Sequence, residues 1–194
     1  MDYEVVECDF ISRTLELLQQ YDGAIIKSMP EEERFEVTLL INCLLGLIVL
    51  PYEYKKHGQA GTNFPKICAC DQTAVRDLDE QWGLKGLEIQ KFKLNGQAIP
   101  ESDMSLRKIV AMLRHSIAHS QFGNGRMPNK PNGVSVFYQD SQLAGQRSKI
   151  TKLNFVNRYE KGNTEFEASI AVDALRTFAM KLSRTILIES DCES

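Results

Sequence analysis

The chain has 194 residues, a formal net charge of −3, 43% hydrophobic residues and 25% charged residues. This composition is typical of a globular domain and excludes disordered and fibrous proteins, and the length suits a single domain over residues 1–194. The five cysteines are an odd number without disulfide-like spacing, so we expect a reduced, cytoplasmic environment.

No segment resembles a signal for export or a membrane span. The acidic N-terminus MDYEVVECDF lacks the basic and then apolar stretches of a secretion signal. The most apolar window, residues 39–50, is shorter than the stretch of about 20 residues that crosses a bilayer. We therefore expect a buried helix there and no membrane partner.

Positive charge is concentrated in one part of the chain. Residues 85–161 contain 13 Lys and Arg against 5 Asp and Glu, which leaves 10 against 21 for the remainder. A basic segment within an acidic chain is compatible with a polyanion that contacts a single patch. A solvated surface that mixes both signs explains the same count.

Helical patterns dominate the N-terminal part. We expect the first helix over residues 9–22, with Asp9 as its N-cap and Gly23 after its end. A second helix should extend over residues 30–50. Because its second half is apolar nearly all round, other elements must cover it, and we place it at the centre of a helical bundle.

The middle of the chain is irregular and then strongly helical. Residues 51–100 contain several Gly and Pro residues and predict a loop-rich elaboration, with one short helix over 73–82. A third helix follows, with Ser102 and Asp103 as alternative N-caps and a stop at Gly123.

The C-terminal part predicts strands and one more helix. Alternating apolar and polar residues mark strands at 134–138, 150–158 and 166–170. The last two form a hairpin with a turn at 160–163, and an amphipathic helix opens at Asp173 as N-cap. The predicted fold is therefore mainly α: a four-helix bundle with a β-hairpin or short sheet inserted at residues 134–171, before the last helix.

The segment LRHSIAHSQFG at residues 113–123 is where we expect the chemistry. It places a guanidinium and two imidazoles, those of Arg114, His115 and His119, near the end of the third helix. On a helical wheel the predicted core face holds Leu106, Ile109, Val110, Leu113 and Ile117. The opposite side holds Ala111, His115, Ala118 and Phe122, with Arg114 and His119 at its edges, roughly 140° apart.

That opposite side is suited to a partner. Small residues such as Ala111 and Ala118 allow a second helix to approach closely, and one Arg114 and His119 pair alone would converge poorly on a phosphate. If two copies of this helix cross at a two-fold axis, each protomer brings both groups to a shared cleft. We therefore predict a homodimer through this helix.

The sequence LRHSIAH at residues 113–119 resembles the R-x4-6-H motif of HEPN domains (higher eukaryotes and prokaryotes nucleotide-binding), here RHSIAH at 114–119. The surroundings fit as well: an N-terminal bundle helix, a very apolar second helix ending LLGLIVLP, the motif near the end of a third helix, and a final amphipathic helix. The resemblance covers most of the chain except residues 51–100 and is greatest to a subfamily found in plasmids and bacterial genomes.

This resemblance implies a metal-independent ribonuclease that needs no cofactor, acts on RNA as a dimer, and serves as a toxin or defence effector. It admits an antitoxin protein as a further partner. RNA carries its own nucleophile in the 2′-hydroxyl, so cleavage needs a base, an acid and a cation. We assign His119 as the acid or base and Arg114 as the group that stabilises the phosphate. His115 would either orient the substrate or fill the dimer interface.

Three other interpretations remain open at this point. Arg114 and His119 could only complement the negative end of the helix dipole. His115 and His119 could join the cysteines of Cys68-x-Cys70 in a tetrahedral metal site, although no C-x2-C or HExxH pattern supports one. The chain could also be a non-catalytic HEPN module that binds nucleotide, RNA or a protein.

Overall fold

The computed structural model describes residues 6–28, 36–50, 82–84, 86–119, 133–139, 149–159 and 163–189. Its helices are α1 (Val6–Gln20), α2 (Ile26–Ser28), α3 (Glu36–Leu44), α6 (Leu106–Ala118) and α7 (Val172–Glu189). Its strands are β1 (Glu88–Leu94), β2 (Gln97–Ala98), β3 (Gly133–Gln139), β4 (Lys149–Tyr159) and β5 (Thr164–Ala171). Two π-helical turns, η1 (Tyr21–Ile25) and η3 (Leu45–Val49), continue α1 and α3, and a 3-10 turn precedes α6 (Glu101–Asp103).

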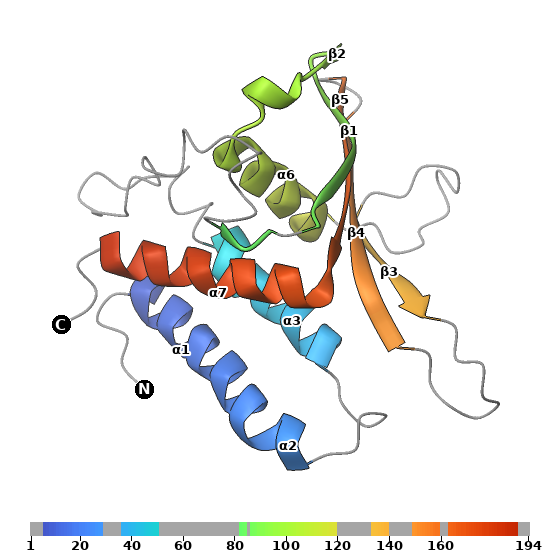
Figure 1. Cartoon of the computed structure of the whole chain (residues 1–194). Helices are drawn as coiled ribbons and strands as arrows, with labels where there is room; N and C mark the ends of the chain where they lie inside the picture. Colours follow the sequence, from blue (N-terminus) through green and yellow to red (C-terminus); the bar gives the residue numbers. More distant parts are fainter. Residues whose placement is uncertain are drawn as a thin grey trace.

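The helices lie in a layer on one face of a single sheet (Figure 1). Helix α6 contacts strands β3 and β4 on one side and the turn η3 on another, so it lies between the sheet and the other helices. The turn η3 also contacts α1 and α7, which places the apolar second helix at the centre of the helical layer. This central position agrees with the sequence of the second helix, which is apolar nearly all round and must be covered by other elements.

The five strands follow the order β2-β1-β5-β4-β3, and every neighbouring pair is antiparallel. The predicted hairpin is present as β4 and β5, with Tyr159 opposite Thr164 at its turn. The prediction of a mainly α four-helix bundle with a β insertion is nevertheless wrong. The chain is an α+β protein, because β1 and β2 extend the sheet on the side of β5 away from β4.

Strands β1 and β2 come from the segment that we expected to be loops, residues 51–100. They are joined by Asn95 and Gly96, both with positive φ, of 52° and 79°. An Asn-Gly pair is the preferred two-residue hairpin connection, because that turn needs positive φ at both positions. Within β1, Phe92 points into the core and packs edge-on against Phe166 of β5, with ring centroids 5.4 Å apart.

Three predicted helix starts shift. Helix α1 begins before Asp9, so this residue lies inside the first turns and is no N-cap. Asp103 belongs to the 3-10 turn, and Met104 after it is extended, so α6 begins at Leu106 with Ser105 at the N-cap position. Helix α7 starts directly after β5, which puts Asp173 in its first turn.

The first helical segment also runs past its predicted stop. Gly23 lies within η1, and α2 continues the segment to Ser28. Other predicted features lie outside the described residues, namely the stop at Gly123 and the short helix before Trp82. The single-domain assignment, with its elaboration at 51–100 and its insertion at 134–171, remains a prediction.

One apolar core joins the helices to the sheet. Among the described side chains of α1, Ile11, Leu15 and Leu18 are buried, whereas Phe10 is exposed. The inner face of the sheet contributes Leu153, Phe155, Phe166, Ala168 and Ile170. Helix α7 contributes Leu175, Phe178, Ala179 and Leu182, which agrees with the prediction of an amphipathic helix.

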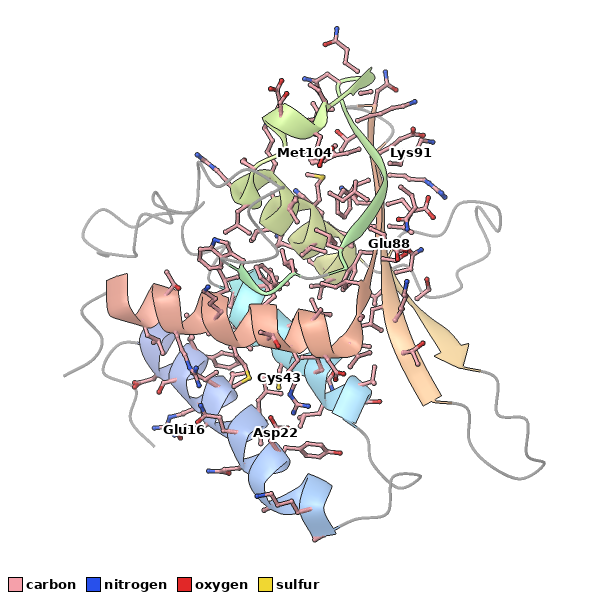
Figure 2. All side chains as sticks on the ribbon, in the orientation of Figure 1. Glu16, Asp22, Cys43, Glu88, Lys91 and Met104 are labelled. Atoms are coloured by element: carbon pink, nitrogen blue, oxygen red, sulfur yellow. The ribbon has the colours of Figure 1, made fainter. Side chains whose placement is uncertain are left out.

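The outer face of the sheet carries charges of both signs, and Figure 2 shows Glu88 and Lys91 on the side of β1 away from the helices. Lys91 and Lys93 of β1 both reach Glu165 of β5, at 2.8 and 3.4 Å. Their hydrogen bonds, the one from Lys91 most of all, hold the pKa of Glu165 below its ordinary value. Lys152 pairs with Glu88 at 2.7 Å. The positive charge counted over residues 85–161 is therefore partly offset on this face.

Among the residues that the structure describes, no helix is both long and apolar enough to cross a membrane.

Candidate functional site

Helix α6 holds the candidate site, and contacts near its start and at its middle fix its position. At its start, Lys108 Nζ donates to the Asp103 carbonyl at 2.6 Å, which ties the helix to the preceding turn. Further along, Asn157 of β4 donates from Nδ2 to the sulfur of Met112 at 3.6 Å. Both Asn157 and Met112 are buried, so this contact lies in the layer between helix and sheet.

The predicted core face of α6 is confirmed. All five of its residues are buried: Leu106, Ile109, Val110, Leu113 and Ile117. The sheet covers a further part of the helix, because Met112 and Ser116 are buried too. What remains open to solvent is a stripe along one side, formed by Arg107, Lys108, Ala111, His115, Ala118 and His119, of which Lys108, Ala111 and His115 are half-buried.

The open stripe agrees in part with the side on which we predicted a partner. Ala111, His115 and Ala118 lie on it as expected, and His119 is exposed at its end. Arg114 does not: its side chain is 6% exposed, although the wheel placed it at the edge of this side. Phe122 lies outside the described residues.

The three candidate side chains form a continuous chain of contacts. Arg114 Nη1 lies 2.9 Å from Nδ1 of His115. The ring of His115 stacks on that of His119, with centroids 5.7 Å apart and planes inclined by 23°. The structure thus brings together all the residues that we proposed for catalysis and substrate binding, through His115 as the link.

The local backbone explains why His119 is accessible. The backbone N–H of His119 donates to the carbonyl of His115 at 3.1 Å, which closes the last helical turn. His119 itself has left the helical conformation, with φ −113° and ψ 31°. Because the helix ends there, the His119 ring meets solvent on one side and the His115 ring on the other.

Comparison with known protein families places most of this chain in a family. A family model described as HEPN pEK499 p136 matches residues 1–191, nearly the whole chain. The chain belongs to this HEPN family. Comparisons with curated proteins and with solved structures give no significant match.

The match covers the described parts of this HEPN protein in both the helical layer and the sheet. It includes strands β1 and β2, which lie within residues 51–100, the segment that the resemblance in the sequence did not cover. The sheet is therefore part of the region that the family model spans. The fold expectation that came with the HEPN resemblance is corrected by the sheet, while the family itself is confirmed.

The described residues of this HEPN protein do not test whether His115 and His119 bind a metal ion. The cysteines that would complete such a site, Cys68 and Cys70, lie outside the described residues. Within the described part of the chain, no three His, Cys, Asp or Glu side chains gather in a way that could hold a metal ion.

The feature that sequence reasoning missed is the contact between Arg114 and His115. Neighbours in a helix do not face each other, so a wheel separates them. The long side chain of Arg114 nevertheless reaches the ring of His115. The only signal in the sequence was that the two residues are adjacent.

Proposed function

We propose that this HEPN protein is a metal-independent endoribonuclease. The observation that carries the proposal is the contact chain from the buried Arg114 through His115 to the exposed His119, at the open end of α6. A guanidinium behind two imidazoles supplies the charge and the proton-transfer groups that RNA cleavage requires. RNA as the substrate class follows from this chemistry together with the family.

In this mechanism His119 removes the proton of the ribose 2′-hydroxyl. The 2′-oxygen then attacks the phosphorus, the bond from phosphorus to the 5′-oxygen breaks, and that oxygen receives a proton. The products are a 2′,3′-cyclic phosphate and a 5′-hydroxyl. Positioned proton transfer contributes about 10²- to 10⁴-fold, and the positive charge of Arg114 stabilises the dianionic phosphorane.

A homodimer through α6 would supply the second proton-transfer group. The open stripe of α6 carries the small residues Ala111 and Ala118 beside His115 and His119, so a second copy crossing there would bring its own histidines close. In such an arrangement one His119 acts as base and its symmetry mate as acid. Activity as a toxin or defence effector, restrained by an antitoxin protein, is the biological role that accompanies this chemistry in the family.

The decisive experiment incubates the full-length protein with single-stranded RNA in EDTA. We expect cleavage that leaves cyclic phosphate ends and that is lost in His119→Ala. Single-stranded DNA of the same sequence is the control, because it lacks the 2′-hydroxyl. Cutting of DNA at the same rate as RNA would contradict the mechanism, and so would dependence on an added divalent metal.

A non-catalytic HEPN module that binds nucleotide, RNA or a protein partner is the second candidate. The burial of Arg114 favours it, since a 6% exposed guanidinium has little surface to offer a substrate. This alternative predicts that the protein binds RNA and leaves it intact, and that His119→Ala changes neither binding nor growth of cells that express it. The EDTA assay separates the two candidates.

A further inference from the structure

We propose that Arg114 is a positioning residue that fixes the tautomer of His115, so that the two stacked imidazoles have different and permanent roles. In this arrangement His115 presents an Nε2–H donor to a phosphate oxygen, while His119 alone carries protons. The inference rests on the proposed ribonuclease function for its substrate. Its central claim, the tautomer, is measurable without any substrate.

The tautomer follows from the chemistry of the contact. A guanidinium has five N–H donors and no acceptor, so at 2.9 Å from Arg114 Nη1 the Nδ1 atom of His115 must accept the hydrogen bond. A nitrogen that accepts carries no proton. The neutral imidazole of His115 therefore has its single proton on Nε2.

Burial makes this assignment persistent. The contact is partly buried, Arg114 is 6% exposed and His115 is half-buried. A cationic His115 would have protons on both nitrogens and would lose the acceptor that the buried guanidinium uses, which is unfavourable for a charged donor. The hydrogen bond from Arg114 therefore opposes the protonation of His115 as well as the other tautomer.

The stacking of the two rings also bears on the role of His119. The ring of His119 lies nearly parallel to that of His115 and is exposed, whereas His115 is held from behind by Arg114. A fixed donor is of no use as a general base, but it can bind a non-bridging phosphate oxygen in the ground state and hold it more tightly as charge develops. Proton transfer is left to the exposed ring, that of His119.

Histidine-ring NMR of the full-length, 15N-labelled protein tests the tautomer directly. At neutral pH we expect His115 to show a proton on Nε2 and a bare Nδ1. In Arg114→Met the guanidinium is gone, and the His115 signals should move toward a mixture of tautomers. Arg114→Lys retains a donor-only cation and should keep more of the original pattern. A proton on Nδ1 in the wild type, or an unchanged His115 spectrum in Arg114→Met, would overturn the proposal.

Two substitutions of His115 then test the roles of its two ring nitrogens separately. In His115→Asn the amide oxygen can accept from Arg114 near the place of Nδ1, but the outward donor is lost. In His115→Gln the amide N–H₂ lies near the place of Nε2, so the outward donor is kept. We expect kcat/KM on a short single-stranded RNA to fall by about 10- to 100-fold more in Asn than in Gln, the value of one hydrogen bond to a charged group.

The reverse order, with Asn the more active variant, would mean that His115 serves only to hold Arg114, and it would overturn the donor role. Failure of the proposed function is a different result. If the wild type cleaves no RNA, the ribonuclease is wrong while the NMR tautomer still tests the Arg114–His115 relationship. If RNA is cleaved and His115 carries its proton on Nδ1, the ribonuclease stands and this inference falls.

Discussion

The imidazole rings of His115 and His119 stack one helical turn apart, with centroids separated by 5.7 Å and planes inclined by 23°. Their surroundings differ, because His119 is exposed at the end of α6 and His115 has Arg114 Nη1 against its Nδ1. This asymmetry means that Arg114 and His119 respond differently to substitution. His119 can be removed at little cost to the fold, and Arg114 cannot.

His119→Ala should abolish RNA cleavage and leave the melting temperature unchanged. The side chain is exposed and follows the last helical residue, so the fold loses little packing. Arg107→Ala is the matched control, because Arg107 is exposed on the same open side of the helix. The measurement pairs an RNA cleavage assay with thermal unfolding. A melting temperature lowered by His119→Ala alone would indicate a structural role for the ring.

Arg114→Ala should destabilise the protein by about 1–3 kcal/mol, the usual cost of removing a buried, hydrogen-bonded polar group. The side chain is 6% exposed and hydrogen-bonds to His115, so both packing and a polar contact are lost. Urea unfolding of Arg114→Ala and His119→Ala checks the contrast. Equal stability of the two variants would show that the burial of Arg114 contributes nothing to the fold. Loss of activity in Arg114→Ala alone therefore does not identify a catalytic group.

Much of the helical layer could be predicted from hydrophobic periodicity. The core face of α6 is buried as expected, and α7 is amphipathic as expected. A helix repeats every 3.6 residues whatever packs against it, so the sequence alone shows which of its faces is apolar. Strands β1 and β2 were missed for a physical reason. In β1 only Phe92 is buried, and lysines flank it on both sides, so the hydrophobic signal is weak although the Asn95-Gly96 turn marked a hairpin.

The candidate site was predictable in its residues but not in its geometry. Composition and motif single out Arg114, His115 and His119 together. A wheel fixes only the direction in which each side chain leaves the helix, and it placed Arg114 toward solvent. Its actual burial depends on elements outside α6 that pack on this part of the helix. A single helix cannot reveal what those elements cover.

Ala118→Glu should convert the proposed homodimer to a monomer. Ala118 is exposed on the open stripe of α6, and two copies related by a two-fold axis would bring two new carboxylates into the same interface. Light scattering at micromolar concentration measures the mass. Gln19→Glu is the control, since it adds the same charge to an exposed position of α1. A monomeric wild type with full activity would contradict the dimer, as would an Ala118→Glu variant that stays dimeric.

Cys43 should make the protein less stable at alkaline pH. This residue lies on α3 within the helical layer (Figure 2), is 4% exposed, and burial raises the pKa of its thiol, although the Arg176 guanidinium opposes the shift. A raised folded pKa favours the neutral thiol. Its contribution is therefore complete below the unfolded pKa, about 8.5, and is lost as pH rises through the folded value.

The free energy of unfolding, measured in urea from pH 7.5 to 10, should consequently fall more steeply for the wild type than for Cys43→Ala. For one ionising group the difference in slope is at most about 1.4 kcal/mol per pH unit. The comparison removes the contribution of the other cysteines, which both proteins share. Parallel curves would show that the thiol ionises as easily in the folded protein as in the unfolded chain.

Gly83→Ala should lower the free energy of unfolding more than Gly86→Ala does, because residues 82–84 pack on α7. Both glycines have positive φ, 70° and 78°, so a side chain at either is strained by about 1–2 kcal/mol. At Gly83 a Cβ atom would also lie 2.7 Å from Cγ2 of Thr177, whereas at Gly86 it would meet no atom within 4 Å. Thr177 cannot simply rotate, because its hydroxyl donates to the Asp173 carbonyl at 2.9 Å.

The additional cost at position 83 should be about 1–3 kcal/mol, the usual penalty for overpacking. It matters to the fold because the neighbouring Trp82 is buried and packs edge-on against Phe178 of α7, with ring centroids 6.5 Å apart. Urea unfolding measures the difference between the two alanine variants. The steric part should be recovered when Thr177→Ser is added to Gly83→Ala, because serine lacks the Cγ2 methyl and keeps the hydroxyl. If the double variant is no more stable than Gly83→Ala, backbone strain accounts for the whole effect.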